Sequence, residues 1–356
     1  MISLGFITLY PNQERGYATE LAKRAPEFGI QLYRFTPTSI EPASEMVLGE
    51  SYNQKRNRWE QSQFEIPTYL YDRCFYSNDE VSTKSQPIMN WLKNRPTNMF
   101  LGQGLPNKWN IYNVISQDEN LLPYVPSTKQ ATSSSTILRT LMKKHELILK
   151  PEKGSMGKGI IGLFLHRNYA EVVYKDANQL KRNQFTNRGE LKNWLDAIVT
   201  KQPYLMQSYL PLQDENNRPF DIRILLQKDA DGKWVEQGRG IRIGLPDHLI
   251  SNLGGGGETH RFDTWTEKMS FQQKQLLIDN IHTITNRLPV VLEENFHPLF
   301  ELGIDLGLTK EGAIFILDTN SKPGRKVILD TDPAIEDVLF TAPLKYCLYL
   351  HSKLST

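Results

Sequence analysis

The sequence predicts an α/β protein whose lobes surround a shared cleft. Its 356 residues exceed the usual size of a single domain, so we expect about two to three compact lobes. Short apolar segments alternate with segments of helical periodicity from the first residues onward. Apolar residues make up 39% of the chain and charged residues 23%, which is typical of a globular protein with ample material for its cores. Composition alone indicates no function.

The first hundred residues have the pattern of a small α/β lobe. We expect strands at residues 2–9, 30–35 and 65–76 and a helix at 13–28 that ends at Gly29. The segment 51–63 is rich in Asn and Gln and is expected to be a polar connection. The Gly- and Pro-bearing segment 101–109 is expected to lead into the next lobe.

The remaining residues alternate between helical and strand patterns. We expect helices near 109–119, 137–144, 190–200 and 266–287, and strands at 204–210, 221–227, 234–243 and 300–306. A polar stretch is expected at 175–188. These patterns divide the chain into an N-terminal lobe at 1–105, a central lobe at 106–203 and a C-terminal lobe at 204–356. The tail at 326–356 is expected either to pack back on a lobe as a helix or to form a partner surface.

Charge and cysteine content exclude several classes of function. The chain has 42 basic and 40 acidic residues, a net charge of +2, so no sequence-wide field attracts nucleic acid or an anionic membrane. Cys74 and Cys347 are far apart and lack partners at zinc-site spacing, which fits a reducing compartment. The N-terminal segment has no positive leader, and no apolar stretch reaches the roughly 18 to 20 residues that span a bilayer. We therefore expect a cytoplasmic protein without nucleic-acid or membrane partners.

A glycine-rich turn follows a predicted strand in LILKPEKGSMGKGII. Lys150 ends this strand, and the turn contains Gly154, Ser155, Met156, Gly157, Lys158 and Gly159. Backbone N–H groups in such a turn can face a phosphate. The turn is not a P-loop, because Glu152 replaces the first glycine of that motif and Gly159 its Ser or Thr. An ordinary hairpin turn is the alternative.

A second segment, LFELGIDLGLTKEGAIFILDTNSKPGR, predicts a hairpin that carries oxygen ligands. A two-residue turn at residues 310–311 or 311–312 places Asp305, Asp318 and Asn320 on the same face, since side chains alternate with period two. Two carboxylates and an amide oxygen among apolar residues favour a hard cation such as Mg²⁺, with nucleotide phosphates as further ligands. The alternative is that Asp318 and Asn320 only begin the turn into Lys322.

Two arginines and a run of glycines are further candidates for a binding site. Arg223 lies two residues after Asp221 on one strand face, and Arg242 lies in the following strand. Guanidinium groups in such positions bind carboxylate or phosphoryl oxygens, although solvated or ion-paired arginines are also common. The glycines at 254–257 form either a loop that closes over a ligand or a simple linker.

Together these features resemble the ATP-grasp superfamily. Within it the chain is similar to the YheC/YheD family, the endospore coat-associated proteins of spore-forming bacteria. The resemblance covers most of the chain, in MISLGFITLY, YLYDRCFY, NKWNIYNVISQDENLLPYVPST, LILKPEKGSMGKGI, PFDIRILLQKD, SNLGGGGE and NSKPGR. It implies an ATP-grasp fold preceded by a small Rossmann-like N-terminal lobe.

The resemblance also implies roles for the residues that match by position. Lys108 and Lys150 would contact the nucleotide phosphates, and the turn from Gly154 to Gly159 would cover the β- and γ-phosphates. The hinge strand that reads adenine through its backbone would contain Met206, Gln207, Tyr209 and Leu210. The magnesium positions, with Mn²⁺ as an alternative ion, would be Asp305, Asp318 and Asn320, and Arg223 and Arg242 would lie near the transferred phosphoryl group.

The function implied is that of an ATP- and Mg²⁺-dependent ligase. It would join a small-molecule or peptide carboxylate to an amine or thiol through an acyl phosphate, in the cytoplasm or at the spore coat and with spore-coat proteins as further partners. Many superfamily members have Glu where this chain has Asp318. This shorter side chain is expected to affect catalytic turnover more than nucleotide binding. The alternatives are a non-catalytic spore-coat assembly protein and an RNA-associated protein, the latter suggested by Lys181, Arg182 and Arg188 near Phe185.

Overall fold

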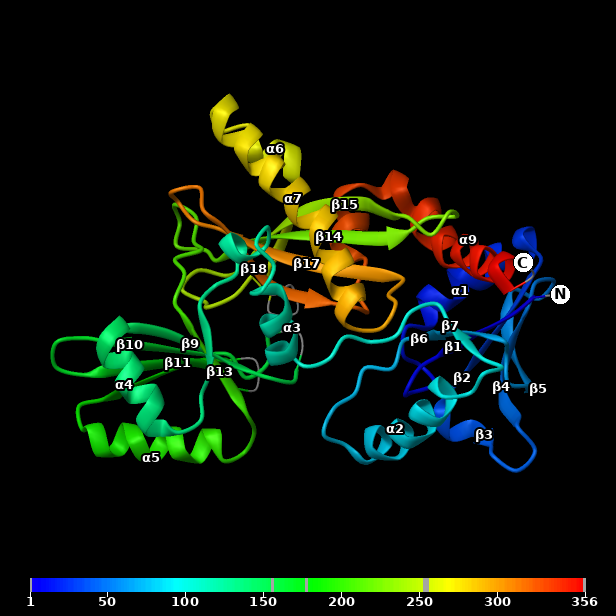
Figure 1. Cartoon of the computed structure of the whole chain (residues 1–356), viewed down its shortest axis with the longest axis horizontal. Coiled ribbons are helices and arrows are strands. Elements are labelled where there is room, and N and C mark those ends of the chain that lie inside the picture. The colour runs from blue at the N-terminus through cyan, green and yellow to red at the C-terminus, as the bar shows by residue number, and fades with distance from the viewer. Residues whose placement is uncertain (1, 155–156, 177–178, 252–255, 355–356) are drawn as a thin grey trace.

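The computed structural model describes residues 2–154, 157–176, 179–251 and 256–354. Three sheets with flanking helices form three lobes that lie side by side (Figure 1), which confirms the predicted α/β class. In the described part of the chain, no helix combines the length and the apolar character needed to cross a membrane.

The N-terminal lobe is built on a mixed sheet with the strand order β3-β4-β2-β1-β6-β7, with β5 paired to β4. Its elements are β1 (Ile2–Ile7), α1 (Arg15–Arg24), β2 (Ile30–Phe35), β3 (Ile40–Glu41), β4 (Met46–Asn53), β5 (Arg58–Glu65), β6 (Tyr69–Asp72), α2 (Glu80–Lys93) and β7 (Met99–Phe100). β1 pairs in parallel with β2 on one side and β6 on the other. One face packs against α1 and the C-terminal helix α9 (Glu336–Leu354), and the other against α2.

One expectation for this lobe is wrong. The polar segment at 51–63 is not a connection, because it forms most of the β4–β5 hairpin. Its apolar residues explain the difference: Tyr52 is buried, and its ring packs edge-on against Trp59 with centroids 5.2 Å apart. The strand expected at 65–76 is also shorter than predicted and spans Tyr69–Asp72.

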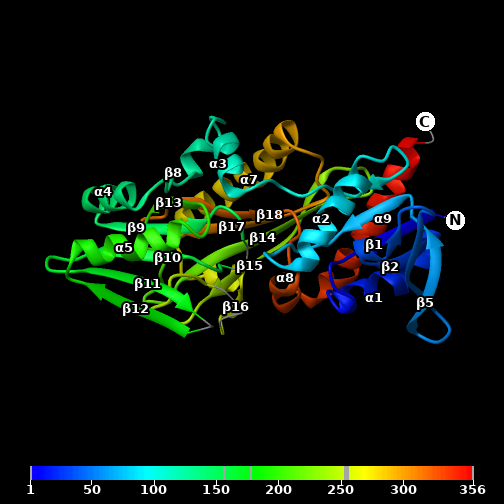
Figure 2. The same cartoon turned by 90° about the horizontal axis from the view of Figure 1, so that it is seen from below.

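The central lobe contains a sheet with the strand order β12-β11-β10-β9-β13-β8. Its elements are β8 (Thr128–Gln130), α4 (Ser134–Lys144), β9 (Glu146–Pro151), β10 (Ile161–Leu165), β11 (Ala170–Asp176), β12 (Gln179–Phe185), α5 (Arg188–Val199) and β13 (Tyr204–Ser208). α4 and α5 pack together along the sheet (Figures 1 and 2). The described residues of the stretch at 175–188 are largely strand, because β11 and β12 pair antiparallel there.

The C-terminal lobe contains a sheet with the strand order β16-β15-β14-β17-β18. Its elements are β14 (Phe220–Lys228), β15 (Trp234–Ile243), β16 (Glu258–Arg261), α6 (Phe262–Thr266), α7 (Phe271–Asn295), β17 (Glu301–Leu308), β18 (Ile314–Asn320) and α8 (Lys326–Thr331). α7 begins after Ser270, whose side chain and Gln273 form a capping box, so it lies later in the chain than the helix expected at 266–287.

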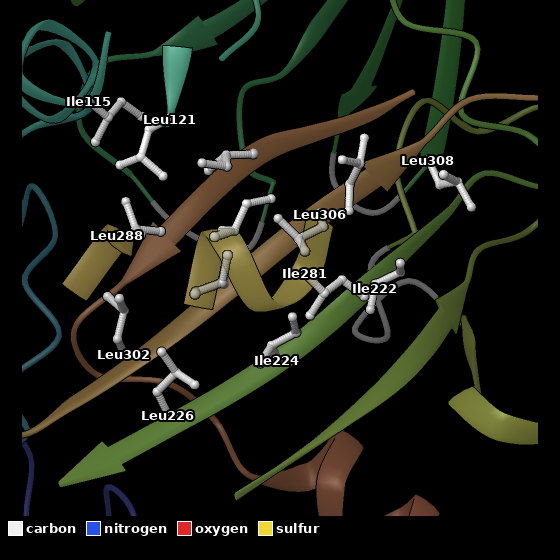
Figure 3. Close-up of a cluster of buried hydrophobic side chains, with 14 of the residues drawn as sticks. Ile115, Leu121, Ile222, Ile224, Leu226, Ile281, Leu288, Leu302, Leu306 and Leu308 are labelled. Atoms are coloured by element: carbon white, nitrogen blue, oxygen red, sulfur yellow. The ribbon is translucent and has the colours of Figure 1, made fainter. Parts of the chain in front are cut away.

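The two faces of β14 have different environments. Ile222, Ile224 and Leu226 belong to the apolar core that α7 covers (Figure 3). Because side chains alternate along a strand, Asp221, Arg223 and Leu225 point to the opposite face. At the Leu225 end this face packs against α8, and at the other end it carries charged groups.

Three elements pack outside the segment to which the sequence assigned them. α3 (Lys108–Ile115) packs against α7 with Ile111 and Ile115 in the C-terminal core. β13 begins at residue 204 but lies in the central sheet. α9 joins the N-terminal core and packs on α1 (Figure 2). These three elements pack with a lobe other than the one that their residue numbers imply. The lobe boundaries at residues 105 and 203 therefore remain a prediction.

Candidate functional site

The hairpin of β17 and β18 places two carboxylates directly opposite each other. Asp305 pairs with Asp318, and Asn320 pairs with Gly303. Near the turn Leu308 pairs with Ile314, and the register shifts by one residue beyond Leu306. This β-bulge at Leu317 brings Asp318 onto the same face as Asp305, since without it Leu317 would lie opposite Asp305.

Asp305 is held by two arginines from neighbouring strands. Arg223 of β14 donates to Asp305 Oδ1, and Arg242 Nη2 of β15 lies 2.9 Å from Asp305 Oδ2. Gly303 leaves room for this contact, because a Cβ there would lie 3.1 Å from the Arg223 guanidinium carbon. Burial opposes ionisation of Asp305, but Arg223 and Arg242 lower its pKa to about 2. The carboxylate is therefore ionised at neutral pH.

Asp221 extends the same cluster on β14. Arg242 donates to both carboxylate oxygens of Asp221 at 2.7 Å, and Ser251 Oγ donates to Asp221 Oδ2. Burial raises the pKa of Asp221, while Arg242 opposes that shift. Burial likewise works against the charge on Arg242, but Asp221 and Asp305 together raise its pKa. Arg242 thus joins two carboxylates on one sheet face.

Two lysines from other elements reach this hairpin. Lys108, at the start of α3, forms an ion pair with Asp318 Oδ1. Lys150, at the end of β9, places its Nζ 3.4 Å from the carbonyl oxygen of Leu317, the bulged residue. Burial lowers the pKa of Lys150 to about 8, although Asp318 raises it. The sheets of the central and C-terminal lobes therefore contribute cations and anions to one region.

Two neighbouring pockets lie between these lobes. The first encloses about 640 Å³ of empty space, including its open mouth, and its lining includes Ile148, Tyr209, Leu210, Asp221 and Ser251. The second encloses about 460 Å³ and is lined by Lys108, Tyr112, Thr128 and Asp318 among others. Lys150, Gln207 and Leu317 line both pockets. Ile111, Val125 and Ile316 also line the second pocket, so both pockets combine apolar side chains with charged groups.

The residues predicted for the hinge lie beside the first pocket, with one exception. Gln207, Tyr209 and Leu210 line it, and Gln207 Nε2 also donates to Thr128 Oγ1 at 2.7 Å. The Met206 side chain is only 2% exposed and belongs to the central core. Only the backbone of Met206 is therefore available to a ligand.

The glycine-rich turn is described in part. Ser155 and Met156 lie outside the described residues. Gly157 has φ +69°, and a Cβ on it would overlap Ile250, a residue of the first pocket. Glycine is therefore required here both by backbone conformation and by the close approach of the turn to the pocket wall. Gly154 has φ +137°, and no atom lies within 4 Å of the position that a Cβ would occupy. In the second glycine run, Gly254 and Gly255 also lie outside the described residues.

The ligand set on the hairpin suits a hard divalent cation. Asp305, Asp318 and Asn320 present two carboxylates and an amide oxygen on one face, and such oxygens are preferred by Mg²⁺. Among the described residues no group of three or more His, Cys, Asp and Glu side chains is arranged to hold a metal ion. A cation at the hairpin would therefore take its remaining ligands from water or from a bound phosphate.

A second charge cluster, which the sequence reasoning missed, lies between the N-terminal and C-terminal lobes. We define this interlobe cluster as Glu14, Arg73, Glu301 and Arg325. Arg73 donates to Glu14 at 2.6 and 2.7 Å and to Glu301 Oε1 at 2.5 Å. Arg325 donates to Glu301 Oε2 at 2.6 Å. The one sign of this cluster in the sequence is that Arg73, in DRC, and Arg325, in PGR, lie next to expected turns.

Asp221 and Ser251 were also absent from the predicted site. The alternation of PFDIRILL, which places Asp221 on the face of Arg223, is the signal that could have identified the aspartate. Ser251 comes three residues before the first glycine of the glycine run and has no other distinguishing pattern.

Sequence comparisons match this chain to one protein family. Residues 97–350 match the family model described as YheC/D-like ATP-grasp. The chain is 41% identical over 355 residues to the endospore coat-associated protein YheC of Bacillus subtilis, covering 100% of this chain and 98% of the relative.

Solved structures share the fold at low sequence identity. The D-alanine-D-alanine ligase from Coxiella burnetii is 8% identical, with a TM-score of 0.54 and coverage of 99% of this chain and 97% of that one. A RiPP-associated ATP-grasp ligase from Chryseobacterium gregarium, solved with ADP and a leader and core peptide, is 12% identical with a TM-score of 0.52, covering 99% of this chain and 97% of that one.

Proposed function

Because the chain belongs to the YheC/D-like ATP-grasp family, we propose that it is an ATP- and Mg²⁺-dependent ligase that activates a carboxylate as an acyl phosphate. The observation that supports this most directly is the meeting of Lys108, Lys150 and Asp318, from three separate elements, at neighbouring pockets. Distant cations and oxygen ligands are brought together in this way where a polyphosphate and its metal ion bind.

The nucleotide would lie across the two pockets. Its base would occupy the first pocket between the hinge residues Tyr209 and Leu210 and the apolar side chains of Ile148 and Leu317. Its phosphates would reach Lys150, which lines both pockets. Lys108 is paired with Asp318 in the structure, so phosphate binding would share this lysine with the carboxylate.

Asp305, Asp318 and Asn320 would hold Mg²⁺, which when bound neutralises phosphate charge and supports in-line transfer. Arg223 and Arg242 keep Asp305 ionised, and because they contact its two oxygens, a bound cation would share this carboxylate with them. The same two arginines lie on the site face of the sheet and would stabilise charge that develops on the transferred phosphoryl group.

The proposed chemistry has two steps and needs no nucleophilic side chain. A substrate carboxylate oxygen attacks the γ-phosphorus, the bond from that phosphorus to the β–γ bridging oxygen breaks, and ADP leaves. A nucleophile such as an amine then attacks the acyl carbon and displaces phosphate. The protein's part is to position the groups, to offset their charge and to exclude water from the acyl phosphate.

We further propose that the chain acts in sporulation. The Bacillus subtilis relative is described as an endospore coat-associated protein. The substrate would be a small-molecule or peptide carboxylate, and the protein would act in the cytoplasm or at the spore coat, with spore-coat proteins among its partners.

The test is calorimetric titration with ADP in the presence and absence of Mg²⁺. Asp318→Asn should lose the Mg²⁺-dependent part of ADP affinity, because one of the proposed carboxylate ligands is removed. The matched control is Asp231→Asn, which alters an exposed turn between β14 and β15. The proposal fails if the wild-type chain binds ADP equally with and without Mg²⁺, or if both variants behave alike.

One observation favours a second candidate, a non-catalytic spore-coat assembly protein that keeps the fold. Asp318 is shorter than the Glu of many superfamily members, and it is paired with Lys108. Magnesium-dependent ADP binding without release of ADP from ATP, in the presence of a broad set of carboxylic acids, would support this candidate over the ligase.

A further inference from the structure

The loop that follows β15 forms part of the wall of the first pocket. We call residues 245–251 the wall loop. Its residues Leu249, Ile250 and Ser251 line the first pocket, which Ile148 of the central lobe also lines. Because the wall loop comes from the C-terminal lobe, its position relative to the central lobe determines how closely the pocket surrounds a ligand.

Both ends of the wall loop are attached to the C-terminal lobe. Just before the loop, the Gly244 N–H donates to the carbonyl oxygen of Pro219 at 2.7 Å. At the last residue of the loop, Ser251 Oγ donates to Asp221 Oδ2 of β14. With both ends held in this way, it is the middle of the wall loop that reaches the central lobe.

Two glycines of the central lobe accommodate apolar side chains of the wall loop. A Cβ on Gly162 of β10 would lie 2.8 Å from Leu249 Cδ2, and a Cβ on Gly157 would lie 2.1 Å from Ile250 Cδ1. Both distances are shorter than the roughly 3.5 to 4.0 Å at which carbon atoms pack. The wall loop therefore packs closely against the central lobe at these two positions.

Arg182 of β12 makes a polar contact with the same loop. Its Nη2 donates to the carbonyl oxygen of Asp247 at 3.0 Å, and its Nη1 lies 3.3 Å from Glu171 Oε2. Val173 of β11 pairs with Gly162 on one side and with Arg182 on the other, so these residues lie on one face of the sheet. Glu171 thus orients the guanidinium group that holds the backbone of the wall loop.

His248 of the wall loop lies beside two cations of the central sheet. Burial and the charges of Lys175 and Arg182 lower the pKa of His248, while Asp247 opposes that shift. Glu171 is the acidic group that pairs with Arg182 on this face. Because the docked position lowers the pKa of His248, docking should weaken as pH falls below the ordinary histidine value of about 6.5.

We propose that Arg182 is a positioning residue of the ligase, which holds the wall loop against the central sheet so that Leu249 and Ile250 enclose the nucleotide. This inference rests on the proposed function, because the first pocket is the proposed place of the base. Arg182 is not among the described residues that line either pocket, so it acts through the loop and does not touch the nucleotide.

The first test is calorimetric titration of the full chain with ADP and Mg²⁺. Arg182→Gln should weaken ADP binding by about two- to fivefold, since the contact that it removes is partly exposed. Lys181→Gln is the matched control, because it removes the same charge from the next residue. Lys181 pairs with Tyr174, whose ring lies 5.6 Å from that of Trp194 on α5, so it points to the other face. An equal effect of both variants would overturn the inference.

The pH dependence of this effect separates positioning from a general structural role. The ratio of ADP affinities of the wild-type chain and Arg182→Gln should be smaller at pH 5.5 than at pH 7.5, because at acid pH Arg182 also repels protonated His248. Protonation of ADP itself weakens binding to both proteins and cancels in the ratio. When both chains also carry His248→Asn, the ratio should be the same at the two pH values. A ratio independent of pH with His248 present would contradict the positioning role.

A second measurement, without nucleotide, follows the wall loop directly. The Asp247 N–H donates to the carbonyl oxygen of Asn217 at 3.2 Å, so hydrogen exchange in a peptide that covers residues 245–251 reports on the loop. Arg182→Gln should speed this exchange and Lys181→Gln should not. Since the Arg182 side chain is 44% exposed, the free energy of unfolding should stay the same in both variants. Unchanged exchange in Arg182→Gln would reject the contact as a constraint on the loop.

The two proposals fail in different ways. If the wild-type chain binds ADP with Mg²⁺ and both variants bind it equally well, the role of Arg182 is wrong and the ligase proposal stands. If the wild-type chain binds no ADP, the ligase proposal is wrong and Arg182 positions no nucleotide wall, and faster exchange in Arg182→Gln would then show only that it holds the loop.

Discussion

The interlobe cluster and the candidate site both contain acidic and basic side chains, but these side chains have different roles in the two places. In the interlobe cluster, Arg73 is 0% and Glu301 2% exposed, and each arginine has a carboxylate within 2.6 Å. In the site, Lys150 Nζ makes a 3.4 Å contact with a carbonyl oxygen, and among the described residues no carboxylate lies within ion-pair distance of it. Buried ion pairs therefore join the lobes at the interlobe cluster, while Lys150, which contacts only a carbonyl oxygen among the described residues, keeps its charge for a ligand.

The largest expected effect comes from breaking the interlobe cluster. Glu301→Gln removes the charge that faces both Arg73 and Arg325 and leaves buried cations without full compensation. Removing one partner of a buried ion pair typically lowers the free energy of unfolding by about 3 kcal/mol or more. Urea unfolding followed by circular dichroism would measure this loss.

The control for that variant is an exposed pair. Lys192→Gln breaks the ion pair with Asp196 on α5, whose side chains are 46% and 42% exposed, and should change the free energy of unfolding by less than about 1 kcal/mol. A loss for Glu301→Gln no larger than the control's would show that the buried charges are not structural.

Lys150→Met is expected to have the opposite effect: it should weaken ADP binding without lowering the free energy of unfolding. It removes a cation that burial already disfavours, so the free energy of unfolding should be unchanged or slightly higher. ADP affinity should fall by about tenfold or more, since charge-assisted hydrogen bonds to phosphate are among the strongest. Calorimetric titration and urea unfolding of the same sample would measure the two quantities.

Lys129→Met provides the matched control for this lysine. Lys129 is exposed on β8 in the same sheet, so neither quantity should change. If Lys150→Met bound ADP normally, the lysine would not contact phosphate. If it unfolded as easily as Glu301→Gln, its role would be structural.

The smallest expected effect is a pH dependence of a few fold. The pKa of Lys150 is about 8, below the ordinary value of about 10.4, so the folded protein loses this proton before the unfolded chain does. Between these two values the group therefore favours folding more as pH rises. ADP affinity should move the other way and weaken above pH 8, because the neutral amine no longer attracts phosphate.

This pH effect can be isolated by comparing variants. ADP titrations at pH 7 and 9 should differ for the wild-type chain and converge for Lys150→Met. ADP binding at pH 8.5 should take up protons, which titrations in buffers of different ionisation enthalpy would detect. An affinity independent of pH in the wild type would mean that Lys150 titrates outside this range.

The β17–β18 hairpin shows what sequence reasoning can and cannot supply. The prediction that Asp305 and Asp318 share a face is confirmed, but neither of the two-residue turns behind it is present. Thr309 pairs with Ala313 across a three-residue loop in which Gly312 has φ +86°. With this loop alone, Asp305 and Asp318 would lie on opposite faces of the hairpin. The bulge at Leu317 restores their alignment, and alternation rules do not foresee two irregularities that cancel.

The same bulge gives Lys150 its carbonyl partner, a contact that spans 167 residues. The local motifs around Lys150, Arg223 and Asp305 were recognisable from sequence because each sits on a short strand with a clear pattern. The interlobe cluster was not, because Arg73 and Glu301 meet across 228 residues and nothing in the segments around them indicates that they pair. Long-range pairing of charged groups depends on how lobes dock, and short-range periodicity does not encode it.

The packing of α9 has a consequence for how the chain is made. Leu344, Tyr346 and Cys347 of α9 belong to the same buried cluster as Leu4 and Phe6 of β1, so β1 leaves the ribosome long before the helix that completes its core. During synthesis the apolar face of β1 must stay shielded by α1 alone or by a chaperone, while the two later sheets can already be complete.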